Sequence, residues 1–271
     1  MVEFNPKEFI KALARDRARK FRDEEFRKMV ERILGVWSDP SHALIELIQN
    51  ADDAKAKWAK FILDGSHLLF FHNGKPFSRL DVKRICSVAL TTKKAGSYIG
   101  FFGIGFKSVF KISHRPHIFS FPFKFFFKRE TPVIPEWIEK IPSRVKRYLD
   151  EKITIFYLPL RTDMSKRTIE RLKDALMRSF DPLSLAFLRH LRQIEFTVNE
   201  EERILKIKKG RFRGKVVKTG KVTIIELINK KERNYDYLLF RKTVRVSPLS
   251  LIHISEPTRP LYISYAVFCL K

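Results

Sequence analysis

The change of hydrophobic period between residues 42 and 71 restricts the fold more than any other feature of this sequence. In "HALIELIQNADDA" apolar residues recur at helical spacing, starting with Leu44, Leu47 and Ile48. The next stretch, "WAKFILDGSHLLFFHNGKPF", loses that spacing, and its two apolar runs flank "DGS", a turn signal. The pattern therefore predicts a helix followed at once by a β-hairpin, which is an α+β arrangement.

Both kinds of element continue along the chain. Amphipathic spacing predicts one or two helices over residues 6–34 and another over 164–180, and Ser78 is placed to cap a short helix, "SRLDVKRIC". Further on, short alternating runs are separated by charged or glycine-containing turns, which is typical of strands. We therefore expect two parts, residues 1–180 with the helices and the hairpin, and a β-rich extension over residues 181–248.

A run of phenylalanines allows two interpretations. In "IFSFPFKFFFKR" they occupy alternate positions, namely Phe119, Phe121, Phe123, Phe125 and Phe127. An aromatic and basic strip of this kind could stack nucleic-acid bases. Aromatic residues at period two are also what a half-buried strand shows. We expect one core strand here.

The last segment, residues 249–271, resembles the in-frame translation of a transposase-type sequencing-library adapter. The stretch "LSLIHISEPTR" resembles its constant part, and "ISYAVFCLK" resembles the part after the index. The other interpretation is an edge strand with its loop. A segment of adapter origin is excluded from fold reasoning. We expect residues 249–271 to be non-native and the natural chain to continue past residue 248.

The charge of the chain bears on its partners. Lys and Arg number 55 against 30 Asp and Glu, a formal net charge of +25, which attracts nucleic acid or anionic surfaces. No apolar run approaches the length of a membrane-spanning helix, and the N-terminal stretch is charged where a signal peptide is apolar. The two cysteines, Cys86 and Cys269, suit a reducing compartment. We expect a soluble cytoplasmic protein with no membrane partner.

Three polar residues of the first predicted helix share one face. Glu46, Asn50 and Asp53 are spaced by four and three, so a carboxylate, an amide and a second carboxylate point the same way. A carboxylate can deprotonate a water, and an amide oxygen suits Mg²⁺. Carboxylates at this spacing also commonly just meet solvent, so the face alone does not define a site.

A glycine-rich stretch follows this helix, "YIGFFGIGFKSVF". It misses the GxxxxGK[ST] phosphate loop by one residue, and its GxxGxG order is not the GxGxxG of dinucleotide-binding loops. Glycines are nonetheless needed where backbone N–H groups approach phosphate closely, and a helix opened by Gly105 would add its positive end.

Three ordered motifs carry a family resemblance. "ELIQNADDA", "HNGKPF" and "IGFFGIGFKSVF" resemble the N box and two glycine boxes of the GHKL ATPases, and more closely the sacsin-like branch of that superfamily. The later "LAFLRHLRQIE" is similar to a segment of the same branch. The resemblance covers roughly residues 30–200. It implies the GHKL (Bergerat) fold, a two-layer α/β sandwich with a mixed sheet, helices on one face, and ATP between the layers.

The resemblance also implies roles for individual residues. Glu46 would be the general base for water attack on the γ-phosphate, and Asn50 would be both a nucleotide contact and the Mg²⁺ ligand. A nucleotide-dependent homodimer of the full-length protein is a further implication. The remaining implied nucleotide-binding residues are Asp53, Ala54, Gly74, Phe77 and Thr154 in the pocket, Thr92 and Lys93 in the lid, and Gly100, Phe101, Phe102, Gly103, Ile104, Gly105 and Phe106 in the hinge and phosphate cradle.

Two positions in these motifs leave alternatives open. His72 stands where the family has an aspartate that binds the adenine amino group, and Pro76 replaces the second glycine of that box. A neutral imidazole can still accept one hydrogen bond, or His72 makes only a local bond at the strand end. Lys107, one turn into the helix after Gly105, faces either phosphate or water.

Overall fold

The computed structural model describes residues 4–36, 39–88, 105–215, 217–242 and 264–269. None of the helices within these ranges is both long enough and apolar enough to cross a membrane. The helices are α1 (Pro6–Phe21), α2 (Glu24–Gly35), α3 (Ser41–Asp53), α4 (Arg79–Ile85), the 3-10 helix η1 (Gly105–Lys111), α5 (Ser143–Lys146), α6 (Lys166–Asp174), the π-helical turn η2 (Ala175–Ser179) and α7 (Ser184–Phe187).

Polar side chains begin two of these helices. Ser78 caps α4 as the sequence predicts, and the structure adds Asp81, which completes a reciprocal capping box. Before α3, the Asp39 carboxylate accepts a hydrogen bond from Ser41 N at 2.8 Å, and Pro40 occupies the N-cap position. Each cap satisfies a backbone N–H group that has no partner inside its helix.

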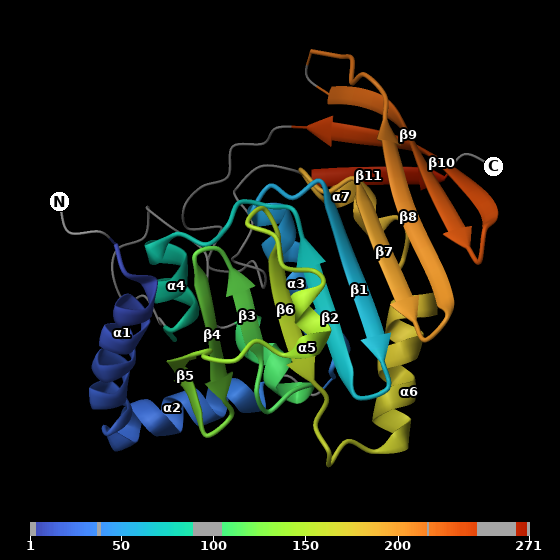
Figure 1. Ribbon diagram of the computed structural model, residues 1–271. Helices are drawn as coiled ribbons and strands as arrows, with labels where there is room; N and C mark the ends of the chain where they lie inside the picture. Colours follow the sequence, from blue (N-terminus) through green and yellow to red (C-terminus); the bar gives the residue numbers. More distant parts are fainter. Residues whose placement is uncertain (1–3, 37–38, 89–104, 216, 243–263, 270–271) are drawn as a thin grey trace.

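The described strands form one mixed sheet (Figure 1). Its order is β11-β10-β9-β8-β7-β1-β2-β6-β3-β4-β5. The strands are β1 (Trp58–Asp64), β2 (His67–His72), β3 (His117–Ser120), β4 (Phe123–Lys128), β5 (Thr131–Trp137), β6 (Thr154–Pro159), β7 (Gln193–Val198), β8 (Glu201–Lys209), β9 (Val217–Ile228), β10 (Lys231–Lys242) and β11 (Ser264–Cys269).

The predicted hairpin lies at the centre of this sheet. β1 pairs antiparallel with β2, so that Phe61 lies opposite Phe70, and the hairpin prediction is confirmed. On its other edge β1 pairs in parallel with β7, with Phe61 opposite Phe196. The sheet is therefore mixed, and its central strand joins residues far apart in the chain.

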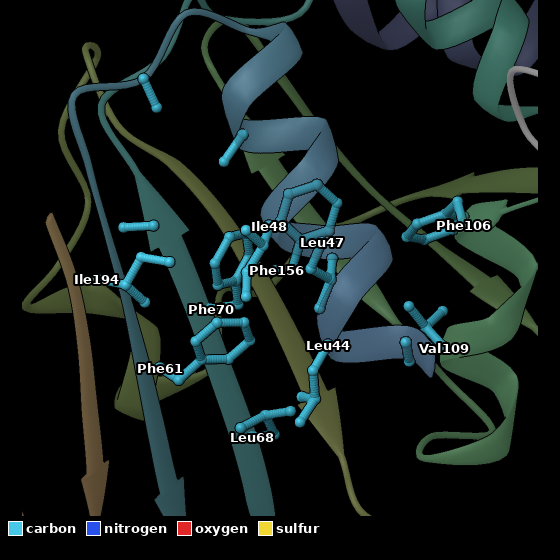
Figure 2. Close-up of a cluster of buried hydrophobic side chains, with 14 of the residues drawn as sticks. Leu44, Leu47, Ile48, Phe61, Leu68, Phe70, Phe106, Val109, Phe156 and Ile194 are labelled. Atoms are coloured by element: carbon cyan, nitrogen blue, oxygen red, sulfur yellow. The ribbon is translucent and has the colours of Figure 1, made fainter. Parts of the chain in front are cut away.

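The main core lies between α3 and the sheet (Figure 2). Leu47 and Ile48 of α3 pack over Phe61, Phe70 and Phe156, and all five side chains are buried. Burying each such side chain stabilises the fold by about 1.5–3 kcal/mol. This packing fixes one face of α3 on the sheet and leaves the Glu46 face directed elsewhere.

A second, smaller cluster covers the opposite face of the sheet. Val145 of α5 and Tyr148 pack there against Leu69 and Phe71 of β2. The architecture is thus an α/β sandwich in which most helices lie on one face and the short α5 segment covers part of the other.

The expectation of one continuous strand of alternating phenylalanines was wrong. The segment folds into two antiparallel strands, β3 and β4, with the turn at Phe121 and Pro122. Phe121 is 54% exposed because it lies in that turn, whereas Phe125 and Phe127 are fully buried. The strip is core and not a base-stacking surface.

The β-rich extension continues the same sheet. Strands β7 to β10 follow one another by antiparallel pairing, and β11 pairs antiparallel with β10, with Leu239 opposite Val267. Residues 249–263 and 270–271 lie outside the described residues. The division near residue 180 and the adapter origin of residues 249–271 stay predictions.

Candidate functional site

Helix α3 presents its polar face away from the sheet. Leu47 and Ala51 are fully buried, whereas Glu46 and Asn50 are only half-buried and Asp53, in the last turn, is exposed. The helical period that buries the apolar residues thereby places Glu46 and Asn50 side by side at the edge of the core.

Gly105, the third glycine of GxxGxG, lies directly against Glu46. A Cβ atom at Gly105 would overlap the Glu46 carboxylate, so only glycine leaves that carboxylate its place. This close approach is part of the packing of η1 against α3. The first and third predicted motifs therefore meet in space.

The turn of "HNGKPF" lies against the C-terminal end of α3. A Cβ atom at Gly74 would be 2.7 Å from the Cβ of Ala54 and 2.9 Å from its carbonyl oxygen. Lys75 N donates to that carbonyl oxygen at 2.7 Å, and the Asn73 side chain accepts from Lys57 N at 2.9 Å. The second motif is thus held to the first by hydrogen bonds, and glycine at position 74 is required by the close approach.

Polar groups line the helix-facing side of the sheet beside this turn. His72 lies opposite Thr154 in the β2–β6 pair, and both side chains are buried. The Ser120 hydroxyl is 2.7 Å from Thr154 Oγ1 and accepts from Phe77 N at 2.8 Å. The predicted residues His72, Phe77 and Thr154 are therefore neighbours. Ser120, which joins two of them, was missed because no sequence signal marks a buried serine.

His72 makes a local hydrogen bond. Gly74 N donates to His72 Nδ1 at 3.0 Å. Burial lowers the pKa of His72 from 6.5 to about 4, so the imidazole is neutral at physiological pH. Of the two alternatives left by the sequence, the local bond is present, and it uses one ring nitrogen.

Lys107 faces neither phosphate nor water, which corrects both alternatives. Its side chain is 1% exposed, and its Nζ donates to the carbonyl oxygens of Ile85 at 2.7 Å and Pro132 at 2.8 Å. Burial lowers the pKa of Lys107 to about 7. The 3-10 geometry of η1 turns this residue into the core, beside the buried ring of Phe127.

Asp52 has a structural role that the sequence did not reveal. Its carboxylate is 6% exposed and accepts three backbone hydrogen bonds, from Arg189 N at 2.9 Å, His190 N at 2.7 Å and Leu191 N at 2.8 Å. These bonds attach the "FLRHLR" segment to the last turn of α3. Asp52 therefore fixes the end of the helix that carries Glu46 and Asn50.

Part of the predicted site lies outside the described residues, namely Thr92, Lys93, Gly100, Phe101, Phe102, Gly103 and Ile104. The described residues include no cluster of three or more His, Cys, Asp or Glu side chains that could hold a metal ion. Asn50 beside Glu46 suits Mg²⁺ of the kind that keeps waters and takes its other ligands from substrate phosphates. At Gly74 and Gly105 the place of a Cβ atom is taken by Ala54 and by the Glu46 carboxylate, so these glycines serve the close packing of the three motifs.

Comparison with known proteins agrees with this arrangement. The family model described as the Sacsin domain matches residues 23–142, which include Glu46, His72 and Gly105. Residues 23–142 of this chain are therefore similar to the sacsin domain. The predicted resemblance to the sacsin-like branch is thereby confirmed.

Relatives of the sacsin domain occur in much longer proteins. "Protein NO VEIN" of Arabidopsis thaliana is 33% identical over 205 residues, which is 68% of this chain and 8% of that protein. Human "Sacsin" is 27% identical over 223 residues, 63% of this chain and 5% of that protein. Among solved structures, the B-subunit of DNA gyrase from Myxococcus xanthus aligns with a TM-score of 0.41 and 10% identity, over 76% of this chain and 67% of that one. The chain thus spans a small fraction of the length of these two curated relatives.

Proposed function

We propose that this chain binds ATP together with Mg²⁺ and hydrolyses it slowly. The observation that carries the proposal is the approach of Gly105 to the Glu46 carboxylate, with Asn50 one helical turn away. This approach brings together a carboxylate that can deprotonate water, an amide that can hold a metal ion, and the glycine that ends the GxxGxG motif. Their order in the chain and the family resemblance support the same assignment.

Each residue then has a separate task in the hydrolysis. The Glu46 carboxylate takes a proton from a water molecule while the oxygen of that water attacks the γ-phosphorus of ATP. The bond between the γ-phosphorus and the oxygen that leaves with ADP breaks. The Asn50 amide oxygen would hold Mg²⁺, which neutralises phosphate charge when bound. Gly105 has no side chain, so its backbone N–H group could approach the phosphates closely.

Isothermal titration of Mg-ATP into the wild-type chain and into Asn50→Ala and Glu46→Ala tests these tasks. Asn50→Ala is expected to lose binding, whereas Glu46→Ala is expected to keep binding and lose turnover. Ile45→Ala, an exposed position beside Glu46, is the control and is expected to change neither. A well-folded wild type that binds no Mg-ATP would refute the proposal. Joint loss of binding and turnover in Glu46→Ala would refute the base role.

This chain covers only 8% and 5% of the length of its two curated relatives, which supports a role as one part of a larger protein. We propose that nucleotide-dependent closure of the domain drives that protein, in chaperone-like, defence or DNA-processing work. A nucleotide-dependent homodimer of the full-length protein belongs to the same proposal, and sedimentation with and without Mg-ATP tests it.

A second candidate function is nucleic-acid binding, favoured by the net charge of +25. Phosphate contacts by Lys and Arg release counterions, so this function predicts binding that falls steeply with salt. A filter-binding assay across salt concentrations, with and without ATP, separates the two. Steep salt dependence with no response to ATP supports the second candidate against the first.

A further inference from the structure

The hydrogen bond at His72 fixes where this side chain carries its proton. A backbone N–H can only donate, so Nδ1, which receives the bond from Gly74 N, must present its lone pair. The residue is 1% exposed, and burial lowers its pKa to about 4, so the ring is neutral. A neutral imidazole with an unprotonated Nδ1 has its proton on Nε2.

His72 is consequently a hydrogen-bond donor toward any ligand. The acceptor nitrogen that the sequence left available for a base is already used by Gly74 N. Nε2 carries the proton and is the ring nitrogen that is left to meet a ligand. A ligand group that accepts a hydrogen bond from Nε2 is therefore favoured over a group that can only donate.

The position of His72 places this donor on the ligand side of the sheet. Residues two apart in a strand share a face, so His72 lies on the same face as Phe70, which packs toward α3 (Figure 2). Its cross-strand neighbour is Thr154, whose hydroxyl is bound to Ser120. This is the polar end of the layer between helices and sheet, and His72 stands there at the position where the GHKL family has its adenine-binding aspartate.

The two classes of purine differ in what they offer such a donor. Adenine carries a 6-amino group, which donates and suits a carboxylate. A 6-oxopurine, such as guanine or hypoxanthine, carries an oxygen there, which accepts. We propose that His72 makes this a site for 6-oxopurine nucleotides in preference to adenine nucleotides. The inference rests on the proposed nucleotide binding and refines its substrate class.

Inosine triphosphate and ATP provide a matched pair of probes, because they differ only in the groups at positions 1 and 6 of the purine. Isothermal titration of each, with Mg²⁺, into the wild type is expected to show about tenfold tighter binding of inosine triphosphate. His72→Asp supplies an acceptor and is expected to reverse the preference. His72→Asn carries both donor and acceptor and is expected to bind the two about equally. His67→Asn, a buried histidine at the other end of β2, is the control and should keep the wild-type ratio.

A second measurement reads the proton position without any nucleotide. A long-range ¹⁵N–¹H correlation spectrum, assigned by comparison with His72→Asp, is expected to show a protonated Nε2 and an unprotonated Nδ1 for His72. Equal or tighter binding of ATP by the wild type would overturn the inference and leave the proposed function standing. A proton on Nδ1, or a ratio unchanged in both His72 variants, would overturn it as well. Failure of the wild type to bind either nucleotide would refute the proposed function and the inference with it.

Discussion

Replacement of Asp52 tests how the helix of the candidate site is held. The three hydrogen bonds to its carboxylate come from Arg189 N, His190 N and Leu191 N, at 2.7 to 2.9 Å. A hydrogen bond to a charged group contributes about 1.5–3 kcal/mol. Since two of the donors are only partly buried and regain water on mutation, the low end of that range applies. Asp52→Ala is therefore expected to lower the free energy of unfolding by about 4 kcal/mol.

Asp52→Asn separates the hydrogen bonds from the volume of the side chain. Asparagine keeps one oxygen, which can still accept the bonds from His190 N and Leu191 N, so the expected loss is about 1.5 kcal/mol. Urea unfolding followed by circular dichroism, with equal m-values, measures both changes. Asp16→Ala is the control, because its carboxylate is half-exposed with partners at 3.8 and 3.9 Å, and it should change stability by less than about 0.5 kcal/mol. A loss below about 1 kcal/mol in Asp52→Ala, or equal losses in both variants, would refute the reasoning.

Two further predictions concern the glycines and the buried lysine. Gly74→Ala is expected to lower stability by about 2 kcal/mol in urea unfolding, because the new Cβ meets the backbone of Ala54. In Gly105→Ala the new Cβ meets only the carboxylate at the end of the Glu46 side chain, so the free energy of unfolding should change by less than about 1 kcal/mol. The substitution should displace that carboxylate and reduce turnover. Equal losses of stability in Gly74→Ala and Gly105→Ala would contradict this difference between the two glycines. For Lys107, burial lowers the pKa from 10.5 to about 7, so between those pH values the unfolded chain binds more protons than the folded one, and stability gained from this residue rises with pH. Urea unfolding of the wild type and of Lys107→Met, each at pH 7 and 9.5, measures this effect. The free energy of unfolding of the wild type is expected to rise relative to that of the variant at the higher pH. A difference between the two proteins that does not change with pH would contradict the prediction.

Local signals in the sequence were sufficient to predict the central helices and strands. The "DGS" turn predicted the β1–β2 hairpin, and Ser78 predicted the start of α4, because both features depend on residues a few positions apart. The contact of Glu46 with Gly105 joins distant parts of the chain and was implied only by the family resemblance; the chemical roles of both residues stay predictions. Features encoded within a short segment can thus be predicted from that segment alone.

Features set by distant partners cannot be predicted in this way. Asp52 looks like a solvated helix-end carboxylate, and its partners lie more than a hundred residues away, in a segment that carries no signal for them. Lys107 is a charged residue next to glycines, yet Ile85 O and Pro132 O hold it in the core. The alternation of phenylalanines hid a turn at Phe121, because the spacing in the sequence stays at two although Phe119 and Phe123 lie on opposite faces of the sheet.

The parallel pairing of β1 with β7 has a consequence for how the chain reaches its fold. One edge of β1 is covered by its own hairpin as soon as residue 72 is made, but the other is covered only by residues 193–198. During synthesis on the ribosome that edge stays open while more than a hundred residues are added, and open edges invite pairing with other chains. Closing so long a loop also raises the contact order, which slows folding. The strand at the centre of the sheet thus keeps one edge open until residues 193–198 have been made, after the strands from β2 to β5 on its other side.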